Sequence, residues 1–221
     1  NPYDVDRKKA AEWFEQAANG GNVSSQWRLA LIHRGGISGN PSREKYIEWT
    51  KKAADNDSAY AAYEMWAIFR KSQGRLVKLE DAERYLTNSA TQGYVMAQFT
   101  YGVALFEGLF GGLNQKAGIE WVKKAAEQGL GWAQLFLGEM LSKGVFLNKD
   151  NNEAFFWLTL AQGSKFQTVR NKAVKLSEQI LPDIKPNDRF GLLQRCRDFK
   201  SKKSLVTRNS DLGLAGVVPD T

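Results

Sequence analysis

Side chains capable of catalysis or metal binding are few and scattered along this sequence of 221 residues. His33 is its single histidine and Cys196 its single cysteine, which excludes a histidine cluster, a Cys-x-x-Cys pair and an intramolecular disulfide. His33 lies near the end of a predicted second helix, where we interpret it as favouring the helix C-terminus and not as the base of a catalytic triad. The Gly-Gly pairs at 35–36 and 111–112 lack the lysine of a phosphate-binding loop and are typical of turns between helices. We therefore expect no enzyme activity, no metal and no cofactor.

Acidic side chains recur at one spacing. Glu12, Glu48 and Glu120 are separated by multiples of 36 residues, and lysines follow two of them at three and four positions, at 51–52 and 123–124. In a helix this spacing brings opposite charges together on one face. A glycosidase-like pair would instead need two carboxyls across a cleft in different environments. The pattern therefore indicates a solvated, ion-paired helix face.

The 36-residue period extends through most of the chain. Aromatic residues occur at 13, 49, 85, 121 and 157, and each is followed by small residues, a turn residue and a second small or amide pair. The columns are Trp13, Trp49, Tyr85, Trp121 and Trp157; Ala17, Ala53, Ser89, Ala125 and Ala161; Gly21, Asp57, Gly93 and Gly129; and Ser25-Gln26, Ala61-Ala62, Ala97-Gln98 and Ala133-Gln134. Helical spacing within each half predicts a unit of two helices joined by a tight turn.

The first unit shows how such a pair would be built. Its first helix is expected over about 7–19 and its second over about 24–34, with the turn at Gly21 between them. The apolar positions expected on the packed faces are Ala10, Trp13, Phe14, Ala17 and Ala18 in the first helix, and Trp27, Leu29, Ala30 and Ile32 in the second. A single pair cannot bury these faces, so stacking of units is required.

The columns resemble the Sel1-like repeat family, which is related to the tetratricopeptide repeats. The fourth unit carries the family motif as Trp121, Ala125-Ala126, Gly129, Ala133-Gln134, Leu137-Gly138 and Gly144, whereas the second departs from it at Asp57, Ala62, Trp66 and Ser72. The resemblance covers about residues 7–163. It implies an all-α fold: a right-handed α/α solenoid of antiparallel helix pairs, with four full 36-residue repeats, a degenerate fifth and C-terminal capping helices.

The repeat fades after residue 163, which divides the chain into three predicted parts. Residues 1–163 form the repeat solenoid, 164–200 the capping helices and 201–221 a polar tail. The last capping helix is expected over 187–200, with Asn187 as its N-cap. Its residues expected to face inward are Phe190, Leu192, Leu193 and Cys196.

Charge and hydropathy limit the classes of partner that we expect. The net charge is +7, of which residues 165–221 hold +6 and residues 1–164 only +1. The basic residues are spread out instead of forming a dense stripe, so a solvated face and no nucleic-acid partner are expected. The alternative is an acidic partner or an anionic surface. No apolar run approaches the roughly 20 residues that span a bilayer. The chain begins Asn1-Pro2 without methionine, and a periplasmic or secreted location after removal of a leader is favoured over the cytoplasm.

Two sets of residues are candidates for partner binding. By the resemblance, the first helices line a concave groove of mixed charge, formed by Glu12, Glu15, Glu48, Lys51, Arg84, Glu120 and Lys123. The position before the Ala-Gln pair is usually polar in the family and caps the second helix. The first unit keeps Ser24 there, and the next three carry Tyr60, Met96 and Trp132. We hypothesise that these three form a partner-binding ridge; the alternative is that they pack into neighbouring turns.

The predicted function is that of a bacterial, non-catalytic scaffold or adaptor that binds another protein. The resemblance leaves two alternatives open. One is a periplasmic immunity protein that inhibits a secreted toxin such as a lipase or phospholipase effector, and the other is a regulatory subunit of a cell-envelope enzyme. The oligomeric state is not determined by the sequence.

Overall fold

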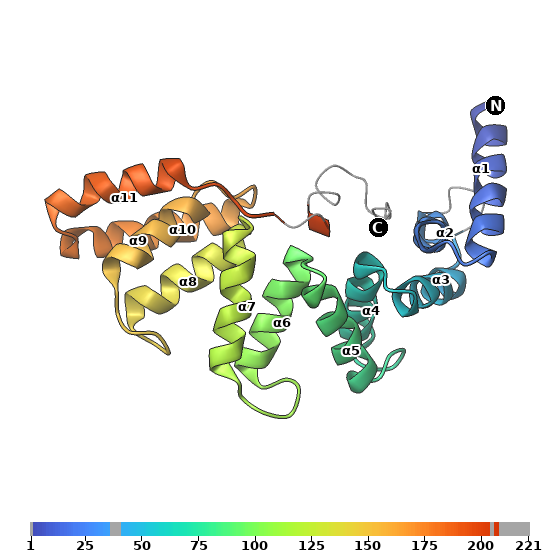
Figure 1. Cartoon of the computed structure of the whole chain (residues 1–221), viewed down its shortest axis with the longest axis horizontal. Helices are drawn as coiled ribbons and strands as arrows, with labels where there is room; N and C mark the ends of the chain where they lie inside the picture. The colour runs from blue at the N-terminus through green and yellow to red at the C-terminus, as the bar shows by residue number, and fades with distance from the viewer. Residues whose placement is uncertain (1, 36–40, 204–205, 208–221) are drawn as a thin grey trace. The chain divides into compact units, whose positions relative to one another are not determined.

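A computed structural model describes residues 2–35, 41–203 and 206–207, with side chains from residue 9 onward. Regular secondary structure within these ranges is entirely helical (Figure 1), which confirms the predicted all-α class. Contacts divide the chain into two compact units. Unit 1 comprises Asn1–Ala97 and Leu205–Thr221, and unit 2 comprises Gln98–Ser204. The predicted domain boundaries at residues 163 and 200 stay a prediction.

Unit 1 is a run of helices in which each packs against its neighbours in the sequence. Its helices are α1 (Pro2–Asn19), α2 (Val23–Gly35), α3 (Arg43–Asp55), α4 (Ala59–Ser72) and α5 (Leu79–Thr91), followed by the start of α6 (Val95–Glu107). Alanines of the repeat columns, among them Ala53, Ala61 and Ala90, are fully buried and allow the helices to approach closely.

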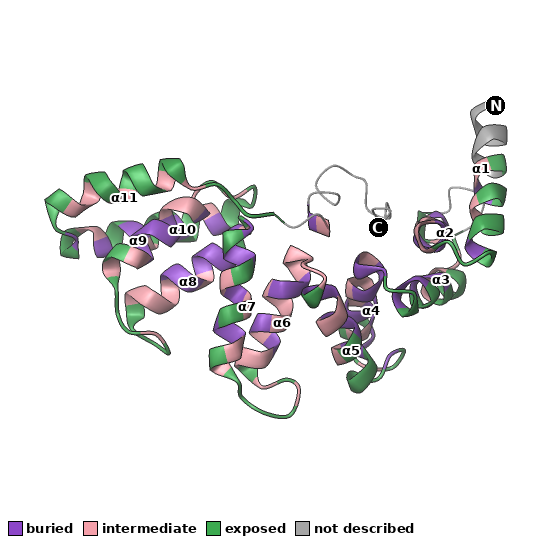
Figure 2. Cartoon of the chain, viewed as in Figure 1, coloured by how far each residue is buried: buried purple, intermediate pink, exposed green. Residues whose placement is uncertain are grey.

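Unit 2 continues the helix pairs and adds the C-terminal helices. It holds the rest of α6, then α7 (Gln115–Glu127), α8 (Gly131–Lys143), α9 (Asn151–Ala161), α10 (Gln167–Ile180), a 3-10 turn at Leu181–Asp183 and α11 (Pro186–Asp198). Helix α9 contacts α8, α10 and α11. The core around it includes Leu135, Leu158, Val169 and Ile184, all nearly or fully buried (Figure 2).

The turns inside the helix pairs share one backbone geometry. Gly21, Asp57, Gly93 and Gly129 all have a positive φ, of 89°, 64°, 92° and 90°. In each turn the next N–H donates to a carbonyl one helical turn back, as Ser58 does to Ala53 at 2.9 Å. This is the Schellman arrangement that ends helices on a left-handed residue. The second unit therefore makes the same turn with an aspartate where the others use glycine.

Replacing Asp57 tests this backbone conformation. The Asp57→Gly variant is expected to be about 1 kcal/mol more stable than Asp57→Ala, because alanine in the left-handed region is strained and glycine is not. Both changes remove the bond that the Asn88 side chain donates to Asp57 at 3.0 Å, so their difference isolates the backbone. Urea denaturation of the two variants measures it, and equal stability would contradict a left-handed residue 57.

The turns between repeats differ in length. Gly108 and Gly144 hold the left-handed position after α6 and α8, with φ of 75° and 66°. Helix α4 is one residue longer than α6 and α8. Gln73 therefore holds the left-handed position after α4, with φ of 53°. Ser72 remains helical and buried there. Gly36, the equivalent of Gly108 in the first unit, lies outside the described residues.

Two predictions about burial are wrong. Trp13 is 69% exposed, although it belongs to the column of buried aromatics. Trp121, in the same column, packs against Tyr101 of the preceding repeat, with ring centroids 5.5 Å apart. On α11, Phe190 is 74% and Leu193 40% exposed instead of facing inward (Figure 2).

The exposure of α11 follows from its single main contact, which is with α9. Leu192 is partly buried against the unit 2 core and Cys196, four residues on, is half-buried. Phe190 and Leu193 lie on other sides of the helix, because successive residues are rotated by about 100°. The N-terminus also differs from expectation: Pro186 is the first helical residue, after Lys185, and Asn187 lies inside the helix. Proline is suited to this place because its φ is already helical.

Candidate functional site

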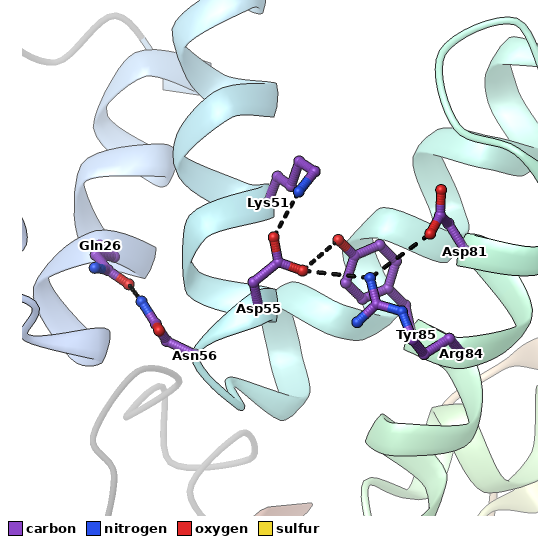
Figure 3. Close-up of polar contacts among 7 residues, drawn as sticks. All are labelled: Gln26, Lys51, Asp55, Asn56, Asp81, Arg84 and Tyr85. Carbon is purple, nitrogen blue, oxygen red and sulfur yellow. Dashed lines mark hydrogen bonds and ion pairs between the residues drawn. The ribbon is translucent and has the colours of Figure 1, made fainter.

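The first-helix face of unit 1 is organised around Asp55, the last residue of α3 (Figure 3). Its carboxylate accepts a bond from Lys51 Nζ at 2.6 Å and one from the Tyr85 hydroxyl of α5, also at 2.6 Å. Arg84 Nη2 lies 3.4 Å from Asp55 and 3.7 Å from Asp81. Side chains of two neighbouring first helices therefore form one network, which we call the Asp55 network.

Burial and hydrogen bonding set the charges in this network. Burial alone would raise the pKa of the Asp55 carboxyl, but the bonds from Lys51 and Tyr85 outweigh it and hold that pKa below its usual value. Burial and the neighbouring carboxylate raise the pKa of Tyr85. The bond to Asp55 raises the pKa of Lys51. The acid stays ionised and the base protonated at neutral pH, so these groups are suited to binding and not to proton transfer.

First helices of both units carry further ion pairs and stacked cations. Lys52 lies 2.8 Å from Glu48 on α3, and Lys123 lies 3.0 Å from Glu120 on α7 in unit 2. The predicted pairing of these acids within their own helices is therefore confirmed. Cations also lie over the repeat aromatics: Lys52 over Trp49 at 4.1 Å, Arg84 over Tyr85 at 4.3 Å and Lys124 over Trp121 at 4.0 Å. Glu12 and Glu15 are exposed on α1.

Amide side chains hold successive repeats together beside this face. The Asn56 side chain donates to the Gln26 side chain at 2.9 Å (Figure 3), and Gln128 donates to Gln98 at 2.8 Å in unit 2. The acceptor in both pairs is the glutamine of the Ala-Gln column. The second repeat has Ala62 at that position and so lacks this acceptor. The amide column of the motif thus sets the spacing of helices that carry the charged face.

The three large residues of the hypothesised ridge occupy the second position of α4, α6 and α8. The Tyr60 ring packs edge to face on Tyr94 of the next repeat in unit 1, with centroids 5.3 Å apart. Trp132 packs on Phe166 in unit 2 at 6.1 Å and remains 37% exposed. Met96 is half-buried. These contacts fit the alternative of packing into neighbouring turns, and partner binding by the three residues stays a prediction.

Helices α2 and α4 are capped two residues earlier than expected. Asn22, not Ser24, accepts the bond from the Ser25 N–H at 2.8 Å at the start of α2. Ser58 takes the equivalent role in α4 by accepting from the Ala61 N–H at 3.4 Å. The positions of Ser24 and Tyr60 therefore lie inside their helices, where they are not needed as caps.

Unit 1 contains a hollow of about 540 Å³ that was not predicted from the sequence. It lies among α2, α3 and α4 and is lined by basic residues, including Arg34 and Lys71, together with Tyr46 and Glu64. The Tyr46 hydroxyl donates to Glu64, and burial followed by this bond raises the pKa of Tyr46 strongly. Arg34 lies 3.7 Å from Glu64. No local motif signals this hollow, because its walls come from two repeats.

Other residues that contribute to the candidate site were also not predicted from the sequence. Asp55 belongs to no column of the motif, and its role arises from a partner 30 residues away. Tyr94 and Thr207 meet from opposite parts of the sequence: the Thr207 hydroxyl donates to Gly93, beside Tyr94. A signal for Tyr94 existed, since it follows the turn glycine directly, but nothing near Thr207 marks it.

Over the described ranges no group of three or more His, Cys, Asp or Glu residues is placed to hold a metal ion. No described helix is long and apolar enough to cross a membrane.

Comparison with known proteins gives the class of this fold. The Sel1 repeat model matches residues 2–22, 23–58, 95–130 and 133–161, which together exceed half of the chain. The chain therefore belongs to the Sel1 repeat family. Sel1 repeat proteins are protein-interaction scaffolds and are generally non-catalytic.

Solved structures share the fold. The crystal structure of c5321, a protective antigen of uropathogenic Escherichia coli with an SLR fold, has a TM-score of 0.71 and 24% identity, over 96% of this chain and 45% of that one. The Sel1 repeat protein from Oxalobacter formigenes has a TM-score of 0.70 and 18% identity, over 88% of this chain and 80% of that one. Both confirm the predicted solenoid class.

One curated relative is similar in sequence. Chitin synthase regulatory factor 3 of Schizosaccharomyces pombe is 29% identical over 162 residues, which is 69% of this chain. The chain spans only 17% of the length of that protein and less than half of the Escherichia coli antigen.

Proposed function

We propose that this chain is a non-catalytic scaffold that binds another protein through the first-helix face of its repeats. The main observation in support of this proposal is the Asp55 network. The side chains of Lys51, Arg84 and Asp55 are 60%, 55% and 36% exposed, yet hydrogen bonds and ion pairs hold each of them in place. Charges that are accessible and already ordered lose little conformational entropy when a partner binds, which favours affinity.

The stacked cations support the same surface. Arginine is one of the residue types that dominate binding energy at protein interfaces. Arg84 and Lys52 are exposed and lie over the buried rings of Tyr85 and Trp49, which help to hold the two cations in place on adjacent first helices of unit 1. The partner expected is a protein with polar groups of both charges, since the face offers both.

A binding experiment tests this surface. The immobilised wild-type chain and the Lys51→Ala/Arg84→Ala variant are compared for capture of proteins from a lysate of the organism that encodes the chain, with identification by mass spectrometry. We expect affinity for the specific partner to fall about tenfold or more, equivalent to at least ~1.4 kcal/mol. Exposed ion pairs contribute only about 0–1 kcal/mol to stability, so the variant should remain folded.

Lys175→Ala is the matched control, because Lys175 is an exposed cation on α10, a C-terminal helix that is not a first helix of the repeats. It is expected to capture the partner as well as the wild type. Equal capture by Lys51→Ala/Arg84→Ala and wild type would reject the first-helix face as the binding surface.

A second candidate function is regulation of an enzyme, which the similarity to a chitin synthase regulatory factor supports. This function uses the same non-catalytic scaffold, but its partner would be an enzyme whose rate changes on binding. Measuring the activity of a captured enzyme with and without saturating chain distinguishes the two: an unchanged rate indicates an adaptor. The immunity-protein alternative stays a prediction.

A further inference from the structure

Val206 and Thr207, here called the C-terminal segment, lie on unit 1 at the start of α6. Thr207 is only 3% exposed. Its hydroxyl donates to the Gly93 carbonyl at 3.2 Å and accepts from the Val95 N–H, also at 3.2 Å. The Tyr60 hydroxyl of α4 donates to the carbonyl of Val206. Three hydrogen bonds therefore hold two consecutive residues of the segment.

Three tyrosines form a cluster next to this contact. The Tyr94 ring packs edge to face against Tyr60 and Tyr63, with centroids 5.3 Å apart in both cases. Tyrosine provides apolar area and a hydroxyl at once, which is why it is enriched at protein interfaces. All three lie in residues 59–94, the one full repeat length that the Sel1 repeat matches leave out between residues 2 and 161. The departure from the family pattern and the docking of the segment thus coincide.

The polar groups at this place select a particular side chain. Gly93 offers an acceptor and the Val95 N–H, in the first turn of α6, offers a donor that the helix itself does not use. A hydroxyl can donate and accept through one oxygen atom, whereas a carboxylate cannot donate and an ammonium group cannot accept. The Gly93 carbonyl and the Val95 N–H together therefore fit the hydroxyl of a threonine or serine.

We propose that Tyr60, Tyr63, Tyr94 and Val95, here called the tyrosine site, bind a partner segment that presents a threonine or serine, and that Val206–Thr207 occupies the site in cis until such a segment displaces it. The proposal deepens the scaffold function by adding a second, regulated contact. It is independent of the Asp55 network, so either can fail without the other.

Tethering makes the segment a competitor. A short tethered segment has an effective concentration of order millimolar at its site, so a free segment of the same sequence binds the intact chain poorly. Weakening the tethered copy should therefore strengthen binding of the free one, which a purely structural role of the segment would not do.

A labelled peptide with the sequence of residues 202–210 measures this competition by fluorescence polarisation on the full chain. The Thr207→Val chain is expected to bind the wild-type peptide about tenfold more tightly than the wild-type chain does, the factor that corresponds to ~1.4 kcal/mol of lost hydrogen bonding. The same peptide carrying Thr207→Val should bind about tenfold more weakly. Adding Tyr60→Phe to the Thr207→Val chain should remove part of the gain.

Thr168→Val is the matched control, because Thr168 is an exposed threonine of α10 in unit 2; it should bind the peptide as the wild-type chain does. Hydrogen exchange at the Val95 amide gives a second readout and should accelerate in Thr207→Val. No gain in peptide binding by Thr207→Val, or unchanged exchange at Val95, would overturn the proposal. The proposal would also be overturned if protection of the Val95 amide from hydrogen exchange decreased when the protein is diluted. The segment would then come from a second copy of the chain.

Discussion

Replacing Tyr85 with alanine is expected to lower the free energy of unfolding by about 3–5 kcal/mol, the range for deleting a buried aromatic side chain. Tyr85 is 1% exposed and is among the largest fully buried side chains. The change leaves a cavity beneath the first-helix face and removes the hydroxyl that bonds to Asp55. Urea denaturation followed by circular dichroism measures the loss.

Two further variants separate the contributions. Tyr85→Phe keeps the ring and loses only the hydroxyl bond, so a loss of about 1 kcal/mol is expected. Trp13→Ala removes a larger aromatic from the same column of the repeat, but Trp13 is 69% exposed. Its expected effect is within about 0.5 kcal/mol of zero. Similar losses for Trp13→Ala and Tyr85→Ala would contradict the difference in burial between the two repeats.

Replacing Gly118 with alanine is expected to destabilise unit 2 by about 3 kcal/mol, toward the upper end for overpacking. A Cβ added to Gly118 would lie 2.6 Å from the Gly102 carbonyl oxygen and 3.0 Å from the Phe106 nitrogen. These are backbone atoms, which cannot rotate away as a side chain would, so α6 and α7 would have to separate. This penalty outweighs the roughly 1 kcal/mol by which alanine is the better helix former.

Gly191→Ala provides the comparison for Gly118→Ala. Gly191 is also a helical glycine of unit 2, on α11, but a Cβ there would meet no atom within 4 Å. Its replacement is expected to raise the free energy of unfolding by about 0.5–1 kcal/mol through helix propensity alone. Thermal denaturation of both variants is the measurement, and a Gly118→Ala chain as stable as Gly191→Ala would show that α6 and α7 do not cross closely at this point.

Part of the candidate site could be predicted because its interactions are local. The pairs Glu48–Lys52 and Glu120–Lys123 lie within single helices, where a spacing of three or four residues is sufficient to bring charges together. The Asp55 network could not be predicted in this way. Asp55 and Tyr85 are 30 residues apart, and they meet only because α3 and α5 stack as successive first helices.

The repeat, the helix pairs and the family could be identified without a structure, because the hydrophobic period, the small residues and the turn glycines act within one unit of 36 residues. The burial of each member of a column could not be predicted in this way. Trp13 and Tyr85 occupy the same place in their repeats, yet Trp13 is 69% exposed and Tyr85 only 1%. The same holds for Thr207, whose site on unit 1 consists of groups more than 100 residues earlier in the chain. Burial and binding depend on neighbours in space, and those neighbours exist only once the repeats have stacked.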